Sequence, residues 1–233
     1  MIRFITQASL VFLISISNLS SQEISTKQNS DGHVKYFYEN GKLFSEGNLK
    51  NGFEDGLWKY YYKNGKLESE GTMIEDFEDG LWKYYYKNGD LSGKITYNEG
   101  VMVGPFKEYY KNGNLELEGS FDENENAIGP YKLYYKNGNL KGEGSFDENE
   151  NLIGPFKKYF RNGNLEVEGS FDENENVIGP VKLYYKNGNL KVEGIIVENS
   201  NDGSRTYELL EGKSYKKNGN FKEISYRATI SLD

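Results

Sequence analysis

The chain has 233 residues, no cysteine, one histidine and a formal net charge of −8 at pH 7. These counts exclude disulfides, thiolate metal sites, a cysteine nucleophile and a lipoprotein anchor, which needs an acceptor cysteine. The acidic balance argues against a nucleic-acid partner, because phosphate binding requires a basic face. Twenty tyrosines and 27 glycines against four prolines are typical of a repetitive β protein, whereas a disordered chain would lack aromatic residues.

Residues 1–21 have the order of a secretory signal peptide. Arg3 lies in a short basic start, and an apolar run from Ala8 to Ile16 follows it before small polar residues. The run is too short to span a bilayer, so we expect cleavage near Ser21 and no transmembrane segment afterwards. The alternative is an uncleaved amphipathic start. Cleavage predicts an extracytoplasmic location, in the periplasm, at the cell surface or in the exterior.

A polar segment, residues 22–32, is predicted to be a flexible lead-in to a tandem repeat. Seven repeats of 24 to 25 residues are predicted over 33–194, and residues 195–233 read as a degenerate C-terminal capping repeat with an insertion. An Asn-Gly pair recurs in every unit, with its asparagine at Asn40, Asn64, Asn88, Asn112, Asn137, Asn162, Asn187 and Asn218.

Each repeat is predicted to be a β-hairpin, as in GLWKYYYKNGKLESEG (56–71). Asn-Gly between two runs of aromatic and aliphatic residues favours a two-residue type I′ loop, because both residues tolerate positive φ. That loop places Tyr62 opposite Leu67 and Trp58 opposite Gly71. The alternative is a three-residue Lys-Asn-Gly loop with a bulge at the glycine, which shifts every pair by one residue and loses the matching of opposite charges.

The two-residue loop predicts opposite charges across nearly every hairpin. One hairpin breaks the rule and sets Lys83 against Lys94. The predicted pairs are Lys35 with Glu46, Lys59 with Glu70, Lys107 with Glu118, Lys132 with Glu143, Lys157 with Glu168 and Lys182 with Glu193. A bulky side chain is also expected over a glycine of the partner strand: Val34 over Gly47, Phe106 over Gly119, Tyr131 over Gly144, Phe156 over Gly169 and Val181 over Gly194.

The connectors between hairpins read as a second set of turns, which gives an all-β fold. We expect an elongated, curled, single-layer antiparallel β-meander of about fifteen short strands. Strand alternation predicts a packing face that carries Trp58, Tyr60, Tyr62, Leu67 and Met73, and a charged face that carries Lys59, Tyr61, Glu68 and Glu70. One tyrosine per repeat forms a column on the charged face: Tyr61, Tyr85, Tyr109, Tyr134, Tyr159 and Tyr184.

The pattern G-x-[WF]-K-x-Y-Y-x-N-G-x-L-x-x-E-G resembles the bacterial variant of the MORN (membrane occupation and recognition nexus) repeat. The resemblance covers residues 33–194 and is weak beyond them. It implies a curled β array used for contact with proteins or membranes, and bacterial chains with this repeat are often labelled antitoxin components of toxin–antitoxin pairs. The predicted signal peptide departs from a cytosolic antitoxin and suits an immunity protein outside the cytoplasm or a surface protein.

The tyrosine column is the candidate binding site. It can accept side chains of a protein partner, sugars or lipid headgroups, or it can simply cover neighbouring strands. The connector Asp-Glu-Asn-Glu-Asn (122–126) resembles half of a calcium loop, but Ala127 and Leu133 stand where the loop needs glycine and glutamate. We therefore expect solvated acidic turns, no metal and no cofactor, with His33 at the surface.

The sequence offers no catalytic constellation, because its acids repeat without a unique pair. The leading hypothesis is a secreted, non-enzymatic scaffold for contact with an unidentified protein partner, including immunity- or antitoxin-like duty. The alternative is a cell-wall or glycan-binding module, since Trp-Lys-x-Tyr-Tyr also resembles choline- and glucan-binding repeats. Those repeats use tryptophan pairs in shorter units, whereas this chain has only Trp58 and Trp82.

Overall fold

The computed structural model describes residues 31–199, 206–225 and 228–230. The predicted signal peptide and residues 22–30 of the lead-in lie outside the described residues. All regular elements within the described ranges are β-strands, and they form one 18-stranded sheet. The predicted all-β fold is thus confirmed.

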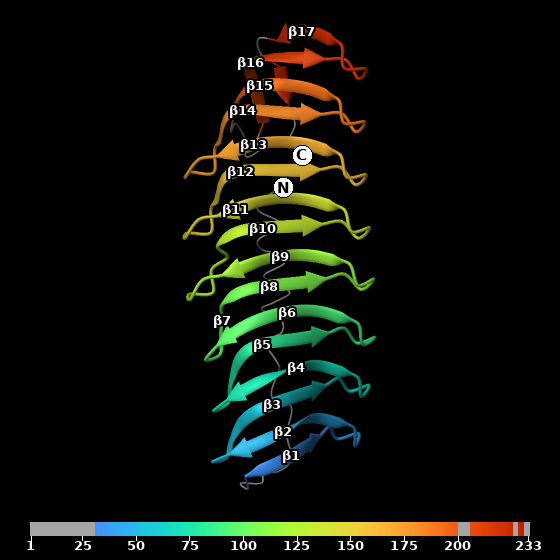
Figure 1. The fold of residues 1–233 in the computed structure, drawn as a ribbon, viewed down its shortest axis with the longest axis vertical. Helices are drawn as coiled ribbons and strands as arrows, with labels where there is room; N and C mark the ends of the chain where they lie inside the picture. The colour runs from blue at the N-terminus through green and yellow to red at the C-terminus, as the bar shows by residue number, and fades with distance from the viewer. Residues whose placement is uncertain (1–30, 200–205, 226–227, 231–233) are drawn as a thin grey trace.

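The strands follow the chain from one end of the sheet to the other (Figure 1). Their bounds are β1 Gly32–Phe37, β2 Leu43–Lys50, β3 Phe53–Tyr61, β4 Leu67–Ile74, β5 Phe77–Tyr85, β6 Leu91–Asn98, β7 Val101–Met102, β8 Gly104–Tyr109, β9 Leu115–Phe121, β10 Gly129–Tyr134, β11 Leu140–Phe146, β12 Leu152–Tyr159, β13 Leu165–Phe171, β14 Val177–Tyr184, β15 Leu190–Asn199, β16 Thr206–Tyr215, β17 Phe221–Ser225 and β18 Ala228–Ile230.

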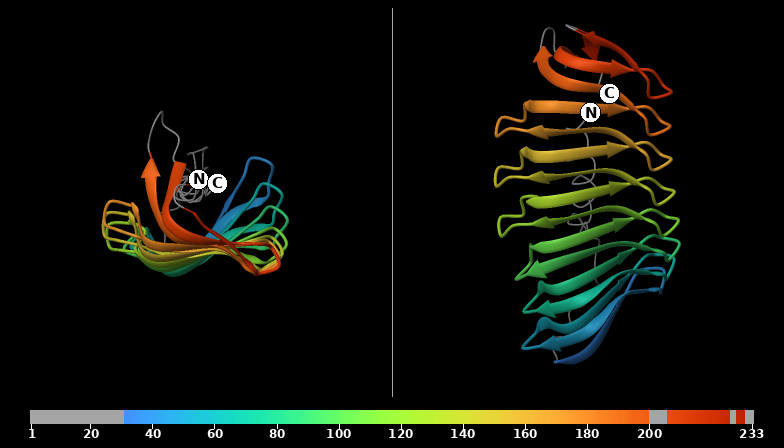
Figure 2. Two further views of the ribbon diagram at one scale, coloured as in Figure 1. Left: turned by 90° about the horizontal axis from the view of Figure 1, so that it is seen from above. Right: turned by 45° about the horizontal axis from the view of Figure 1, so that its top comes forward.

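Most strands pair with the strands before and after them in the chain, and every pairing is antiparallel. The short β7 pairs with β6, which also pairs with β8. At the C-terminal end β16 pairs with β15 on one side and with both β17 and β18 on the other. Figure 2 shows that the strands are bent along their length, so that the single layer forms a trough that runs along the long axis of the molecule. The predicted curled meander is therefore present.

One face of the sheet carries the apolar core. Trp58, Trp82 and Val181 are almost completely buried, and further apolar side chains follow from strand to strand in one cluster. Aromatic rings pack between successive hairpins, with Tyr60 lying 6.0 Å from both Trp58 and Trp82 by ring centroid. A single layer can bury these residues because each repeat packs its side chains against the next one.

The hairpin loop differs from the predicted type I′ turn. The Tyr62 N–H donates to the Lys66 carbonyl at 2.8 Å, and the Gly65 N–H donates to the Tyr62 carbonyl at 2.7 Å. Gly65 has a φ of 88°, while Asn64 is not in the left-handed region. This is the three-residue loop with a glycine bulge that was the alternative.

The predicted charge pairing nevertheless holds, because a second bulge restores the register. Tyr61 pairs with Leu67 and Tyr60 with Ser69, so Glu68 is an extra residue on β4. Beyond this bulge Lys59 lies opposite Glu70, as predicted. The prediction that Tyr62 lies opposite Leu67 was wrong. The three-residue loop shifts the pairing by one residue and the bulge at Glu68 shifts it back, so the charge pairs are kept.

The bulge also exchanges the predicted faces of two residues. Leu67 lies opposite Tyr61 and therefore on the face of the tyrosine column, not on the packing face. Glu68 is partly buried, which raises its pKa, and its charge helps to raise the pKa values of Tyr38 and Tyr62. Its carboxyl group thus lies near the tyrosines that precede the loop.

Connectors between hairpins are turns, as predicted, and some have the geometry expected for the hairpin loop. Asn51 and Gly52 both have positive φ, 54° and 82°, between the paired residues Lys50 and Phe53. They form the two-residue type I′ turn. In the later connectors a glutamate takes the left-handed position, as Glu125 does with a φ of 63°.

The covered glycines are confirmed in part. A Cβ on Gly119, Gly144 or Gly169 would meet Phe106, Tyr131 or Phe156 respectively at about 3 Å, as expected from the hairpin pairs. The residue over Gly47, however, is Trp58 of the next hairpin and not Val34. The Trp58 indole reaches back over the preceding strand, so that its Cδ2 and Cε2 atoms lie 2.3 Å from the position of a Gly47 Cβ.

Candidate functional site

The tyrosine column lies on the face opposite to the apolar core, and most of its hydroxyls are already hydrogen-bonded. Each of these donates to a glutamate of the preceding hairpin, which joins successive repeats. The bonds are Tyr61 to Glu46 at 2.6 Å and, all at 2.8 Å, Tyr85 to Glu70, Tyr134 to Glu118, Tyr159 to Glu143 and Tyr184 to Glu168. Tyr215 continues the column with a 2.8 Å bond to Glu193.

The tyrosines of these pairs are harder to ionise than free tyrosine. Burial, followed by the hydrogen bond to a carboxylate, raises the pKa of Tyr61, Tyr85, Tyr134, Tyr159 and Tyr184 to about 12. The hydroxyls therefore remain protonated donors throughout the physiological pH range. Their rings are partly exposed and present an aromatic surface with fixed orientation, so a binding role for the column stays a prediction.

Beside the tyrosines runs a row of alternating charges across the strands, here named the charge row. Its members lie opposite one another in the strand pairing. In order they are Lys35, Glu46, Lys59, Glu70, Lys83, Lys94, Lys107, Glu118, Lys132, Glu143, Lys157, Glu168, Lys182, Glu193 and Lys213. The predicted Lys–Glu registers and the Lys83–Lys94 exception are confirmed.

Only some charge-row neighbours form direct ion pairs. Lys35 lies 3.2 Å from Glu46, and Lys107 lies 3.0 Å from Glu118. Lys83 contacts Glu70 of the preceding hairpin at 3.7 Å. These side chains are largely solvent-exposed on the lysine side, so each pair adds little to stability, and the row chiefly sets the charge pattern of the face.

The alternation fails at one place, where Lys94 lies between Lys83 and Lys107. The tyrosine that by repeat spacing would bond to residue 94 is Tyr109, because Tyr85 bonds to Glu70 fifteen residues earlier. Tyr109 consequently has no glutamate acceptor, and its hydroxyl has no hydrogen-bond partner among the described residues.

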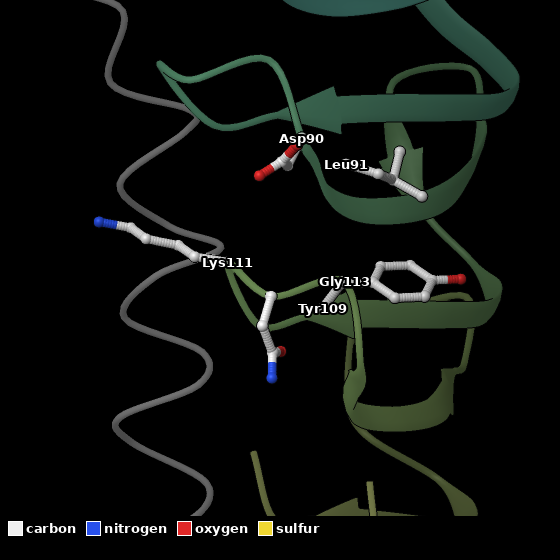
Figure 3. Close-up of a pocket in the computed structure, with 6 residues that line it drawn as sticks. Asp90, Leu91, Tyr109, Lys111 and Gly113 are labelled. Atoms are coloured by element: carbon white, nitrogen blue, oxygen red, sulfur yellow. The ribbon is translucent and has the colours of Figure 1, made fainter. Parts of the chain in front are cut away.

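A hollow adjoins this break (Figure 3). It has a volume of about 300 Å³ and is lined by Asp90, Leu91, Tyr109, Lys111, Asn112 and Gly113. Leu91 and Tyr109 come from successive hairpins and point to the same side of the sheet (Figure 3). The hollow is open to solvent and has both an aromatic wall and polar turn groups.

A second tyrosine column was missed by the sequence analysis. Its hydroxyls donate to main-chain carbonyls one repeat ahead, as Tyr62 does to Tyr85 at 2.6 Å and Tyr110 to Tyr134 at 2.7 Å. Lysines of the loops lie over these rings, with the Lys87 ammonium 5.9 Å from the Tyr62 ring centre. The sequence signal for this column was a tyrosine that recurs at the repeat spacing directly before the loop. Equal spacing places each such tyrosine beside the same part of the next hairpin.

The acidic connectors use their oxygens within the chain. Asp122 Oδ1 accepts the N–H groups of Asn124 and Asn126 at 2.8 and 2.9 Å, which lowers the pKa of that carboxyl. Glu150 reaches back to accept the Ala127 N–H at 3.0 Å. These carboxylates fix the turns and link repeats. Within the ranges that the structure describes, no three His, Cys, Asp or Glu side chains group together as metal ligands.

Seven segments of the chain match the MORN repeat variant family: 30–51, 54–75, 78–99, 102–123, 128–148, 152–173 and 178–197. The chain belongs to this family. The seven segments equal the predicted repeats in number, and the MORN resemblance is confirmed. No curated protein matches this MORN repeat protein at a significant level.

Two solved structures are similar to parts of this MORN repeat protein. A porin-like protein from Bacteroides uniformis ATCC 8492 is 9% identical with a TM-score of 0.21, covering 79% of this chain and 91% of its own. The TcdB2-TccC3 structure is 11% identical with a TM-score of 0.17, covering 92% of this chain and 16% of its own. Scores this low carry no argument about fold or activity. Separately, the described residues contain no helix that is long and apolar enough to cross a membrane.

Proposed function

We propose that this MORN repeat protein is a non-enzymatic scaffold that binds a protein partner outside the cytoplasm. The observation that carries the proposal is the face with the tyrosine column and the charge row. It extends over consecutive hairpins with partly exposed rings beside fixed charges, and no described element covers it. Aromatic residues among arranged charges are the usual material of protein interfaces.

The regularity of this face favours binding over catalysis. Its glutamates hold equivalent positions and bond to equivalent tyrosines, as Glu118, Glu143 and Glu168 do. A catalytic pair of acids needs two carboxyl groups in different environments, one protonated and one ionised. Repeated, equivalent acids serve recognition along a line instead.

Export is supported by the order of charge, apolar residues and small residues in 1–21. Export and the family together support a more specific form of this proposal, in which the scaffold has an immunity- or antitoxin-like role outside the cytoplasm. Such a role requires a tight protein partner, so identification of the partner tests it directly.

The experiment is affinity capture with residues 22–233 from the envelope and supernatant of the host, followed by mass spectrometry. The test variant carries serine at Tyr134, Tyr159 and Tyr184, and the matched control carries phenylalanine there, which keeps the rings. We expect one saturable protein partner that the serine variant loses and the phenylalanine variant retains. Circular dichroism must show that both variants fold.

Retention on isolated cell wall or lipid fractions, competed by soluble sugar or headgroup, would replace the scaffold by a wall- or membrane-binding module. Equal capture by the serine variant would remove the tyrosine column from the interface.

A further inference from the structure

The single break in the charge row is a site with unmatched positive charge. Lys94 lies on β6 directly opposite Lys83 on β5 and Lys107 on β8. Like charges that face each other across strands are destabilising. Every other lysine of the row lies opposite at least one glutamate, so this position departs from a pattern that the chain otherwise keeps.

The nearest glutamates of the row are already engaged on either side. Glu70 accepts the Tyr85 hydroxyl at 2.8 Å and lies 3.7 Å from Lys83. Glu118 accepts the Tyr134 hydroxyl at 2.8 Å and lies 3.0 Å from Lys107. Lys83 and Lys107 thus pair with glutamates on the sides away from Lys94. No carboxylate lies within 4 Å of the Lys94 ammonium in the described part of the chain.

Tyr109 supplies an independent sign of a missing acceptor. Five other members of the column donate to a glutamate at the equivalent position, whereas residue 94 is a lysine and cannot accept. The Tyr109 ring also lines the hollow of about 300 Å³ beside the break. The break therefore offers a free hydroxyl donor and an ammonium without a counter-ion, and it shares Tyr109 with a hollow whose lining also includes Asp90 and Lys111.

We propose that this break, formed by Lys83, Lys94, Lys107 and Tyr109, binds a carboxylate of an acidic segment in a protein partner. Elsewhere on this face a carboxylate accepts one tyrosine hydroxyl and one lysine ammonium together, as Glu118 does with Tyr134 and Lys107. A partner's Asp or Glu would complete the same arrangement here. The proposal rests on the scaffold function and assigns a position on it.

The probe is a hexaglutamate peptide with blocked termini, titrated calorimetrically into the full chain at about 0.1 M salt, where charges interact over about 10 Å. We expect saturable binding that Lys94→Gln weakens about tenfold and Lys94→Glu abolishes. The matched control is Lys132→Gln, whose lysine lies between Glu118 and Glu143, and it should bind like the parent. Lys94→Glu should also raise the melting temperature, which shows that loss of binding is not loss of fold.

The tyrosine gives a second matched pair. Tyr109→Phe removes the free donor and should weaken peptide binding several-fold, while Tyr134→Phe removes an internally bonded donor and should leave it unchanged. Equal binding by the parent and Lys94→Glu would overturn the proposal. So would saturation by inorganic phosphate without binding of the peptide, because the site would then be a phosphate site.

Affinity capture separates this inference from the scaffold function. If Lys94→Glu loses the peptide but still captures the partner, the partner uses another part of the face, and the proposal is overturned while the scaffold stands. If the parent binds the peptide through Lys94 but captures no protein, the site stands and the scaffold function fails.

Discussion

At the scale of single residues, most side chains of the repeat are constrained by a neighbour one repeat away. The Tyr85 hydroxyl needs Glu70, and Trp82 needs the bare backbone of Gly71. Such constraints explain why the same residue types recur so closely in every unit. Glu108 is the clearest departure from this pattern on the apolar face.

Glu108 occupies a place that Leu133 and Leu183 hold in other repeats. It is buried opposite Leu117, and its Oε1 atom has no hydrogen-bond partner. Burial, followed by repulsion from Glu116, raises the pKa of Glu108 to about 7. The folded state thus holds its proton more tightly than the unfolded state does.

The contribution of Glu108 to the free energy of unfolding should therefore be most favourable below the ordinary glutamate pKa, fall as pH rises from about 4.5 to about 7, and stay low above that. Between these values the folded chain binds more protons than the unfolded chain. Glu108→Leu should remove this loss and stabilise the protein at pH 8 by about 3 kcal/mol at most. Urea unfolding at pH 5 and pH 8 measures the difference, and an identical pH dependence in parent and variant would refute the assignment.

A second residue-scale prediction concerns the glycine under Trp82. A Cβ on Gly71 would lie 2.3 Å from the indole atoms Cδ2 and Cε2, so Gly71→Ala must displace a buried ring. We expect a loss of about 3 kcal/mol or more in the free energy of unfolding. Gly142→Ala is the control, because its nearest neighbour is the Lys157 carbonyl oxygen at 3.4 Å. Equal losses in urea unfolding would show that the close approach is not the cause.

At the scale of elements, the same Asn-Gly pair forms two different turns. Asn51-Gly52 forms a two-residue type I′ turn, but Asn64-Gly65 is part of a three-residue loop. In the loop, Asn64 Oδ1 accepts the Lys66 N–H at 2.9 Å and its amide donates to the Lys87 carbonyl of the next hairpin at 2.9 Å. The local sequence predicts that a turn forms, but the Asn-Gly pair alone does not specify its type. The Asn88-Gly89 loop has the same three-residue geometry although the Asn88 amide donates to Asp90 of its own loop.

The connector at Glu75 offers a test of turn chemistry. Glu75 and Asp76 both have positive φ, 52° and 71°, which is unfavourable for a residue with a long side chain. Glu75→Asn should raise the free energy of unfolding by about 0.5 to 1 kcal/mol, because asparagine tolerates this conformation better. Glu125→Asn is the comparison, because the Glu125 carboxylate also accepts the Met102 N–H at 3.1 Å. Loss of this hydrogen bond should offset the gain from the more favourable backbone conformation. Thermal melts should rank the two variants in that order.

At the scale of the whole molecule, the repeat spacing was sufficient to predict a single-layer meander and the charge pairing across its hairpins. The repeat spacing did not predict two other features of the structure. The exchange of Leu67 and Glu68 between faces follows from a bulge that compensates for the loop, and no single-hairpin pattern specifies it. The second tyrosine column depends on how one hairpin stacks on the next, which fixes bonds such as Tyr62 to the Tyr85 carbonyl. The candidate site was predicted as a column and the Lys83–Lys94 pair as an exception to the charge pairing, whereas the pairing of Lys94 with Lys107 depends on how successive hairpins align.

The repeats form a linear array in which whole hairpin units can be removed. Deleting 129–153 joins Ile128 to Gly154 and removes one complete repeat, so β9 should pair with β12 as it now pairs with β10. Because each unit contacts only its neighbours, the shortened chain should fold with the same circular dichroism per residue. Its urea m-value should fall by about one eighth, in proportion to the surface removed.

Deleting only 129–139 is the matched control. It removes β10 with its loop and leaves β11, which runs in the same direction as β9, to follow β9 directly. An antiparallel meander cannot continue through two successive strands of equal direction joined by a short turn, because a parallel pair needs a long crossover. This variant should therefore lose cooperative unfolding. If both deletions fold equally well, the hairpin is not the unit of assembly, and each strand adds to the sheet independently.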